Sequence, residues 1–218
     1  MKKIAVVLCG SGFKDGSEIR ESVLTLLALD EADAQFECFA PDDQQHDVVN
    51  CLTGEEMNEK RNLLVEAARI ARGDIKPLTS LKASDFDGVM FPGGFGVAKN
   101  LCTFAFKGSQ GEVRSDVNNV IHDFYNNKKP IGAVCIAPAL IALSLKDKNL
   151  NLTLGSDGEA SEEIKKLGHK HTATKPHECV IDHENKIATS PAYMYDDARL
   201  KDIKTGIAGV VKAITQDL

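Results

Sequence analysis

One cysteine of this sequence has a position that suits nucleophilic chemistry. Cys135 follows the apolar run 130–134 and precedes an apolar, helix-forming segment over 136–145. A side chain at such a sharp strand-to-helix turn is presented at the edge of a sheet, as in the nucleophile turn of many hydrolases. Free N–H groups and the dipole at the start of a helix favour the thiolate form of cysteine. Free cysteine is also commonly buried as an apolar side chain, so position alone leaves a catalytic and a structural role equally open.

A glycine-rich turn follows another expected strand, at residues 87–91. Pro92 is followed by Gly93 and Gly94, and such glycines let the backbone approach a ligand closely and point N–H groups at it. The N–H groups of Gly94 and Ile136 together would form an oxyanion hole. The turn lacks the G-x-x-x-x-G-K-[ST] pattern, so it is not a phosphate-binding loop. A tight structural turn without a ligand is the alternative interpretation.

Two acidic residues near the N-terminus are candidates for proton transfer. Glu18 and Glu21 lie one turn apart in a helix that Ser17 is expected to cap, so both can face one cleft. A carboxylate close to Cys135 would move protons during catalysis. Acidic residues at a helix start also oppose the helix dipole, which is the commoner reason for their presence.

Composition and charge exclude several classes of function. The 218 residues carry a net charge of −6 without a basic block, so neither nucleic acid nor an anionic membrane surface is expected as a partner. No apolar run reaches the roughly 18 residues of a membrane helix. Residues 1–8 resemble a strand more than a signal peptide, and we expect a cytoplasmic protein. Six cysteines show no C-x-x-C spacing, and His169 and His171 alone are weak evidence for a metal, so no metal site is expected.

Strand and helix patterns alternate along the chain. Strands are expected over 4–8, 36–40, 87–91, 130–134, 150–154, 178–182 and 186–190, and helices over 17–27, 62–72, 113–125, 136–145, 161–167 and 197–215. This order predicts a single α/β domain over 1–218, with a mainly parallel sheet, helices on both faces and an antiparallel hairpin at one edge. Sites of such folds form where the strands end. The polar segment 41–60 is too long for a simple connection, which is typical of a functional or subunit-contact insertion.

The residues around Cys135 resemble a known family. Residues 133–138 (Ala-Val-Cys-Ile-Ala-Pro), the upstream Phe-Pro-Gly-Gly of 91–94 and the acidic first helix are similar to the PfpI/Parkinsonism-associated deglycase superfamily, which has the class I glutamine amidotransferase-like fold. Within it, the chain resembles the ElbB group, known as isoprenoid biosynthesis or enhancing lycopene biosynthesis proteins. The segments that carry this finer resemblance are 15–19, 38–42, 52–55, 61–62, 92–101 and 190–194.

The resemblance implies a flavodoxin-like three-layer α/β sandwich and a homodimer. It implies a glyoxalase that needs neither glutathione nor any other cofactor and converts glyoxal, a small dicarbonyl, to glycolate, with a possible link to isoprenoid biosynthesis. It assigns the nucleophile to Cys135 and the acidic partner to Glu21, with Glu18 beside it. It assigns the oxyanion donors to Gly94 and Ile136, in a site that includes Gly93.

Two other functions use the same cysteine. A redox-sensing or regulatory protein would cycle Cys135 through sulfenic or sulfinic acid. An amidase or amidotransferase would need a histidine within hydrogen-bond reach of Cys135. Many members of the superfamily carry histidine directly after the nucleophile, and this chain has Ile136 there. Turnover of a dicarbonyl would separate the glyoxalase from the redox sensor, and a fixed histidine would favour the amidotransferase.

Overall fold

Six of the seven strands predicted from the sequence join one seven-stranded sheet. The computed structural model describes residues 1–218, and its sheet has the order β3-β2-β1-β4-β5-β9-β8. The strands are β1 (Lys3–Val7), β2 (Gln35–Ala40), β3 (Ile75–Pro77), β4 (Gly88–Phe91), β5 (Ile131–Val134), β8 (Val180–Asp182) and β9 (Ile187–Ser190). All neighbours are parallel except β8 and β9, which form the predicted antiparallel hairpin at one edge.

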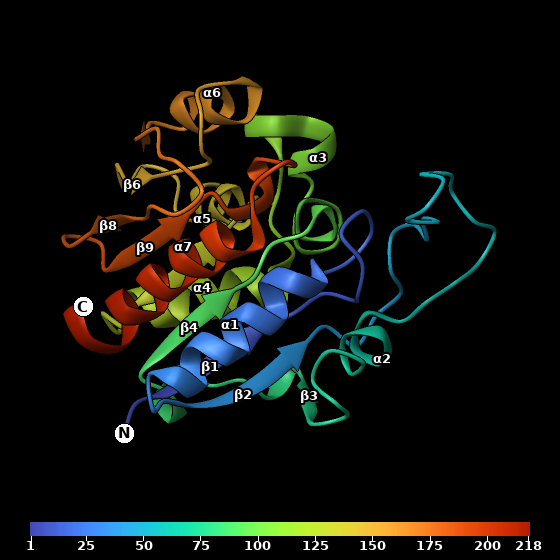
Figure 1. Ribbon diagram of the computed structural model, residues 1–218, viewed down its shortest axis with the longest axis horizontal. Coiled ribbons are helices and arrows are strands. Elements are labelled where there is room, and N and C mark those ends of the chain that lie inside the picture. Colours follow the sequence, from blue (N-terminus) through green and yellow to red (C-terminus); the bar gives the residue numbers. More distant parts are fainter.

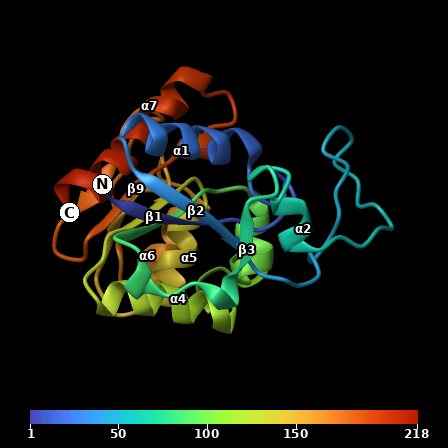
Figure 2. The same cartoon turned by 90° about the horizontal axis from the view of Figure 1, so that it is seen from below.

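Helices cover both faces of this sheet, so the predicted three-layer α/β architecture is confirmed. Figure 2 shows α1 and α7 on one face and α4 and α5 on the other. The helices are α1 (Ile19–Glu31), α2 (Leu63–Ala67), α3 (Phe104–Lys107), α4 (Ser115–Asn126), α5 (Ala137–Ser144), α6 (Glu159–Lys166) and α7 (Leu200–Lys212). None of them combines the length and the apolar character that crossing a membrane requires.

Helix α5 is the most deeply packed helix. Its sequence, APALIALS, is apolar on every side, and all eight of its residues are buried. A helix without a polar face lies inside the protein core. Strand β5 before it is also fully buried, so the turn that carries Cys135 is held rigidly from both sides.

Four local predictions differ from the structure. Helix α1 is capped by Glu18 rather than Ser17, because the Ser17 hydroxyl accepts a hydrogen bond from the Cys9 N–H at 2.8 Å and is unavailable as a cap. Helix α2 ends at Ala67, and the chain continues in turns to Gly73. The three-residue strand β3 has no clear apolar pattern and was not expected.

The fourth difference concerns residues 150–154, which do not join the main sheet. Only Asn151–Leu152 are extended (β6), and they pair with β7 (Lys170–His171) in a separate two-stranded sheet. The N–H groups of Asn151 and Thr153 donate to the side chains of Asp182 and Thr189 instead of to strand carbonyls.

Residues 41–60 form an arm that projects from the body of the molecule (Figure 1). The arm contains no helix and no named strand, as the polar sequence predicted, and has only an isolated bridge between Val49 and Glu56 within it. Its base is fixed to the body by at least four polar contacts, one of which is the pair between Arg114 and Asp43 at 2.9 Å. The Val49 N–H donates to Asp15, the His46 N–H donates to Asn100, and Lys99 pairs with Asp47 at 2.5 Å.

Candidate active site

Cys135 lies at the sharp turn between β5 and α5, where the sequence predicted it. Its φ angle is +59°, a left-handed conformation that is strained for a residue with a side chain. The Cys135 N–H donates to the Ser190 carbonyl at the end of the neighbouring β9, at 3.0 Å. Ile136 follows as the N-cap of α5, so the start of this helix lies directly beside the thiol. The side chain is 7 % exposed, which leaves only a small part of it open to a ligand.

The carboxyl group of Glu21 faces this thiol from helix α1. Glu21 is fully buried, and its carboxyl interacts with the Cys135 thiol, since each group shifts the pKa of the other. The Gly93 N–H donates to Oε2 at 3.1 Å, and the Tyr193 N–H donates to Oε1 at 3.0 Å. Two backbone donors therefore fix the carboxyl plane, and the acid holds a defined position against the sulfur.

Gly93 lies between the two side chains. A Cβ atom at this position would lie 2.3 Å from the Cys135 Cβ and 2.5 Å from Oε2 of Glu21. No side chain fits there, so glycine is required for the cysteine and the acid to approach each other. Gly94 has a φ angle of +105°, and its N–H, like that of Ile136, lowers the pKa of the Cys135 thiol. These are the two donors that the sequence predicted for an oxyanion.

Glu18, the N-cap of α1, packs against the same glycine turn. Its N–H donates to the Gly93 carbonyl at 2.8 Å, and a Cβ on Gly94 would be 2.3 Å from the Glu18 nitrogen. Its carboxylate Oε2 accepts the Glu21 N–H at 2.6 Å and so caps α1. The structure thus brings together all six residues predicted for the site, Glu18, Glu21, Gly93, Gly94, Cys135 and Ile136.

Burial disfavours the charged forms of both Glu21 and Cys135. Burial raises the pKa of the Glu21 carboxyl to about 8; the negative charge of Glu18 adds to this, and the hydrogen bonds from Tyr193, Cys135 and Gly93 lower it only in part. Burial also raises the pKa of the Cys135 thiol well above its ordinary value, and the Glu21 carboxylate raises it further. The N–H groups of Gly94 and Ile136 offset only part of this rise. The sequence predicted a thiolate favoured by the helix start; desolvation outweighs that effect.

The site opens into a large cleft of about 1680 Å³. Cys135, Ile136, Gly94 and Glu18 line one part of it, and Glu21 does not reach it. Elsewhere the cleft is lined by aromatic side chains and by residues of the arm, including Phe13, Phe95, Phe106, Asp47 and Glu56. The predicted involvement of 41–60 in the site thus rests on arm residues between Asp47 and Glu56, which form a wall of the cleft.

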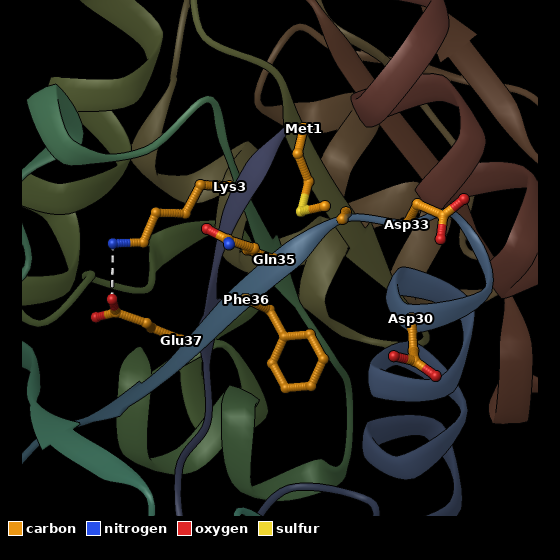
Figure 3. A pocket seen from close by; sticks show the side chains of 8 residues that line it. Met1, Lys3, Asp30, Asp33, Gln35, Phe36 and Glu37 are labelled. Atoms are coloured by element: carbon orange, nitrogen blue, oxygen red, sulfur yellow. Dashed lines mark ion pairs between the residues drawn. The ribbon is translucent and has the colours of Figure 1, made fainter.

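A second hollow lies at the other edge of the sheet, where β1 and β2 begin (Figure 3). Its polar side chains include Asp30, Asp33 and a surface ion pair between Lys3 and Glu37 at 2.7 Å. It contains no nucleophile, and parallel α/β folds carry their sites at the opposite, carboxyl edge. We therefore assign no chemistry to it.

The histidines take no part in the cysteine site. His169 is buried between the Leu150 N–H and the Ala142 carbonyl, and His171 accepts the Leu154 N–H while its other ring nitrogen lies 3.1 Å from Asp157. No histidine hydrogen-bonds to Cys135 or Glu21. Three or more His, Cys, Asp or Glu side chains do not converge anywhere in the chain in an arrangement that could hold a metal ion.

Sequence reasoning gave no role to Tyr193 or Ser190, although both support the site. The Tyr193 backbone holds Glu21, its hydroxyl accepts a 3.1 Å hydrogen bond from Arg20, and its side chain lines the cleft. One signal in the sequence could have indicated both residues. They lie at the end of the strand that became β9, and residues that end a strand next to β5 lie at the same edge of the sheet as Cys135.

The sheet, the strained cysteine turn and the glycine loop define an amidotransferase-like α/β domain. No family model matches the chain. Curated relatives include the rat ES1 protein homolog, mitochondrial, and the human glutamine amidotransferase-like class 1 domain-containing protein 3, mitochondrial. Both are 40 % identical over 98 % of this chain, which covers 83 % and 82 % of their lengths.

A solved structure is similarly close. The isoprenoid biosynthesis protein with amidotransferase-like domain from Ehrlichia chaffeensis is 38 % identical, covers 98 % of both chains and superposes with a TM-score of 0.91. The chain therefore belongs to this amidotransferase-like family of ES1 and isoprenoid biosynthesis proteins, as its resemblance to the ElbB group predicted.

More distant structures share the fold alone. A ThiJ/PfpI domain protein from Brachyspira murdochii is 16 % identical, covers 99 % of this chain and 97 % of its own, and has a TM-score of 0.63. The fold is therefore the one that the resemblance to the PfpI superfamily predicted. The curated relatives are named as mitochondrial proteins, so the cytoplasmic location expected from the sequence stays a prediction.

Proposed function

We propose that this protein is a cofactor-independent glyoxalase, which converts glyoxal to glycolate through a covalent bond to Cys135. The observation that carries the proposal is the buried Cys135–Glu21 pair. Both carboxylate oxygens of Glu21 are held by backbone N–H groups, and its pKa is raised to about 8, within the range of a working acid and base. Such a pair can add to a carbonyl and then move a proton between adjacent carbons.

The first half of the reaction forms a hemithioacetal. The sulfur bonds to one aldehyde carbon while the thiol proton passes through Glu21 to the new oxygen. The N–H groups of Gly94 and Ile136 stabilise the negative charge that develops on that oxygen. Because the pair gives up its proton only as the bond forms, a thiol with a raised pKa is compatible with this step.

The second half isomerises the adduct. Glu21, now ionised, takes the hydrogen from the sulfur-bearing carbon and delivers a proton to the neighbouring carbon, while the hydroxyl proton moves from the first oxygen to the second. The product is a glycolyl thioester of Cys135, and no electrons leave the substrate. Water then cleaves the thioester to give glycolate and the free thiol.

Two further elements complete the proposal. The relative from Ehrlichia chaffeensis is named an isoprenoid biosynthesis protein, and we include a link between the dicarbonyl activity and isoprenoid synthesis. We also retain the homodimer expected from the superfamily, which size-exclusion chromatography with light scattering would test.

The direct test measures glycolate released from glyoxal without glutathione by the wild type, Cys135→Ala and Glu21→Gln. We expect turnover by the wild type and its loss in both variants, with unchanged folding by circular dichroism. Folded wild-type protein that releases no glycolate would rule out the glyoxalase, and the redox-regulatory role of Cys135 would replace it. The amidotransferase alternative is weakened, because no histidine is within hydrogen-bond distance of the cysteine.

A further inference from the structure

Thioester hydrolysis, the last step of the proposed reaction, needs a base that Glu21 is badly placed to provide. Glu21 is fully buried and does not line the cleft through which water arrives. Both of its oxygens already accept a backbone N–H, Oε1 from Tyr193 and Oε2 from Gly93. Water that arrives through the cleft therefore meets side chains that line the cleft before it meets the Glu21 carboxyl.

Glu18 has both the access to the cleft and the free oxygen that activation of water requires. It lines the cleft together with Cys135, Gly94 and Ile136. Only Oε2 is used by the helix cap, and Oε1 makes no hydrogen bond within the chain. Backbone contacts to Gly93 and Gly94 hold Glu18 on the turn whose N–H group reaches the cysteine sulfur. It is thus the carboxylate that has a free oxygen at the cysteine end of the cleft.

We propose that Glu18 is the general base that activates water for hydrolysis of the Cys135 thioester. Oε1 accepts one proton of a cleft water as the water oxygen bonds to the thioester carbon. The N–H groups of Gly94 and Ile136 hold the resulting oxyanion. The carbon–sulfur bond then breaks, the sulfur takes up the proton from Glu18, and glycolic acid leaves. Glu21 thus catalyses the isomerisation, and Glu18 catalyses the release of product.

The surroundings of Glu18 favour this role. Burial raises the pKa of its carboxyl above the ordinary value. The Glu21 N–H and the charge and backbone N–H of Arg20 lower this pKa only in part. A more basic carboxylate removes a proton from water more effectively. The site also lacks the histidine that would otherwise act as a base, since Ile136 follows the nucleophile and no histidine contacts it.

The inference rests on the proposed glyoxalase activity and is tested by separating acylation from hydrolysis. Glu18→Gln keeps an oxygen for the helix cap and removes the base. We expect its steady-state glycolate release to fall at least about 100-fold, the usual contribution of a general base. Intact-protein mass spectrometry after rapid quenching should show the added glycolyl group accumulating on Cys135. Hydroxylamine, added after glyoxal has been removed by desalting, should release it.

A control variant and separate contrary outcomes distinguish failure of this inference from failure of the proposed function. Glu31→Gln changes an exposed carboxylate at the other end of α1, outside the cleft, and should turn over like the wild type without an adduct. If Glu18→Gln matches the wild type, or loses turnover without accumulating the thioester while remaining folded by thermal melting, the base role is overturned and the glyoxalase proposal stands. If the wild type itself makes no glycolate and forms no adduct, the proposed function fails first.

Discussion

The backbone N–H of Tyr193 donates a 3.0 Å hydrogen bond to Oε1 of Glu21, across 172 residues of sequence. This bond and the 3.1 Å bond from Gly93 leave the carboxyl no freedom to rotate away from Cys135. Substitutions other than proline leave a backbone donor in place, so the arrangement depends on how the segment after β9 packs beside α1.

The first prediction concerns the pH dependence of turnover. The reactive Cys135–Glu21 pair must lose one proton, and burial raises the pKa of Glu21 to about 8. The kcat/KM for glyoxal should therefore rise about tenfold per pH unit below pH 8 and level off above it, as the pair titrates as a unit. Steady-state assays between pH 6 and 9 check this. A profile that is flat from pH 6 upward would mean that the pair is already ionised at neutral pH.

The second prediction concerns stability. The Glu21 carboxyl has its pKa raised from 4.5 to about 8 by burial, so between these values the folded state holds a proton that the unfolded state lacks. The free energy of unfolding should fall as pH rises through this window, by up to about 1.4 kcal/mol per pH unit. Urea unfolding of the wild type and Glu21→Gln at pH 5, 6.5 and 8 isolates this contribution. The advantage of the wild type over the variant should shrink as pH rises; a constant difference would refute the assignment.

A third prediction tests the close approach at Gly93. An alanine Cβ would lie 2.3 Å from the Cys135 Cβ, so Gly93→Ala must push the cysteine and Glu21 apart. We expect a loss of about 1–3 kcal/mol in the free energy of unfolding and a fall of about 100-fold in kcat.

Gly158→Ala is the matched control for this change. A Cβ on Gly158 meets no atom within 4 Å, so both quantities should stay near the wild-type values. Urea unfolding and glycolate assays of the two variants check the comparison. Equal behaviour of Gly93→Ala and Gly158→Ala would show that the contact at Gly93 has no effect on the site.

The fourth prediction concerns the contact that fixes the arm. Lys99 and Asp47 pair at 2.5 Å with only 10 % and 16 % of their side chains exposed. Lys99→Met leaves the Asp47 carboxylate without its partner, and should cost about 3 kcal/mol of the free energy of unfolding. Tryptic cleavage after Lys60 or Arg61, at the end of the arm, should become faster.

The double variant Lys99→Met/Asp47→Leu removes both charges and should recover part of the loss. Lys165→Met changes an exposed pair with Glu162 and should cost less than about 1 kcal/mol. If Lys99→Met unfolds and is cleaved like Lys165→Met, the buried pair does not hold the arm. Urea unfolding and timed proteolysis give the two readouts.

Most of the sheet was predictable because its strands are buried on both faces. Runs such as Ile131–Val134 are apolar throughout, and this pattern is read directly from the sequence. The failures lie where tertiary contacts decide. Strand β3 has only three residues, and its place in the sheet depends on pairing with β2. Likewise, Ser17 is bonded to Cys9, which leaves the helix cap to Glu18.

The sequence by itself determined the fold class and the position of Cys135, since a strand followed directly by an apolar helix is a local pattern. It also identified the glycine turn and the acidic start of α1. Only the tertiary structure decided that Glu21 interacts with Cys135 rather than simply opposing a helix dipole, and that Tyr193 holds it there. Those contacts, and the burial that raises both pKa values, join segments far apart in the chain, so their energies depend on packing that no local pattern contains.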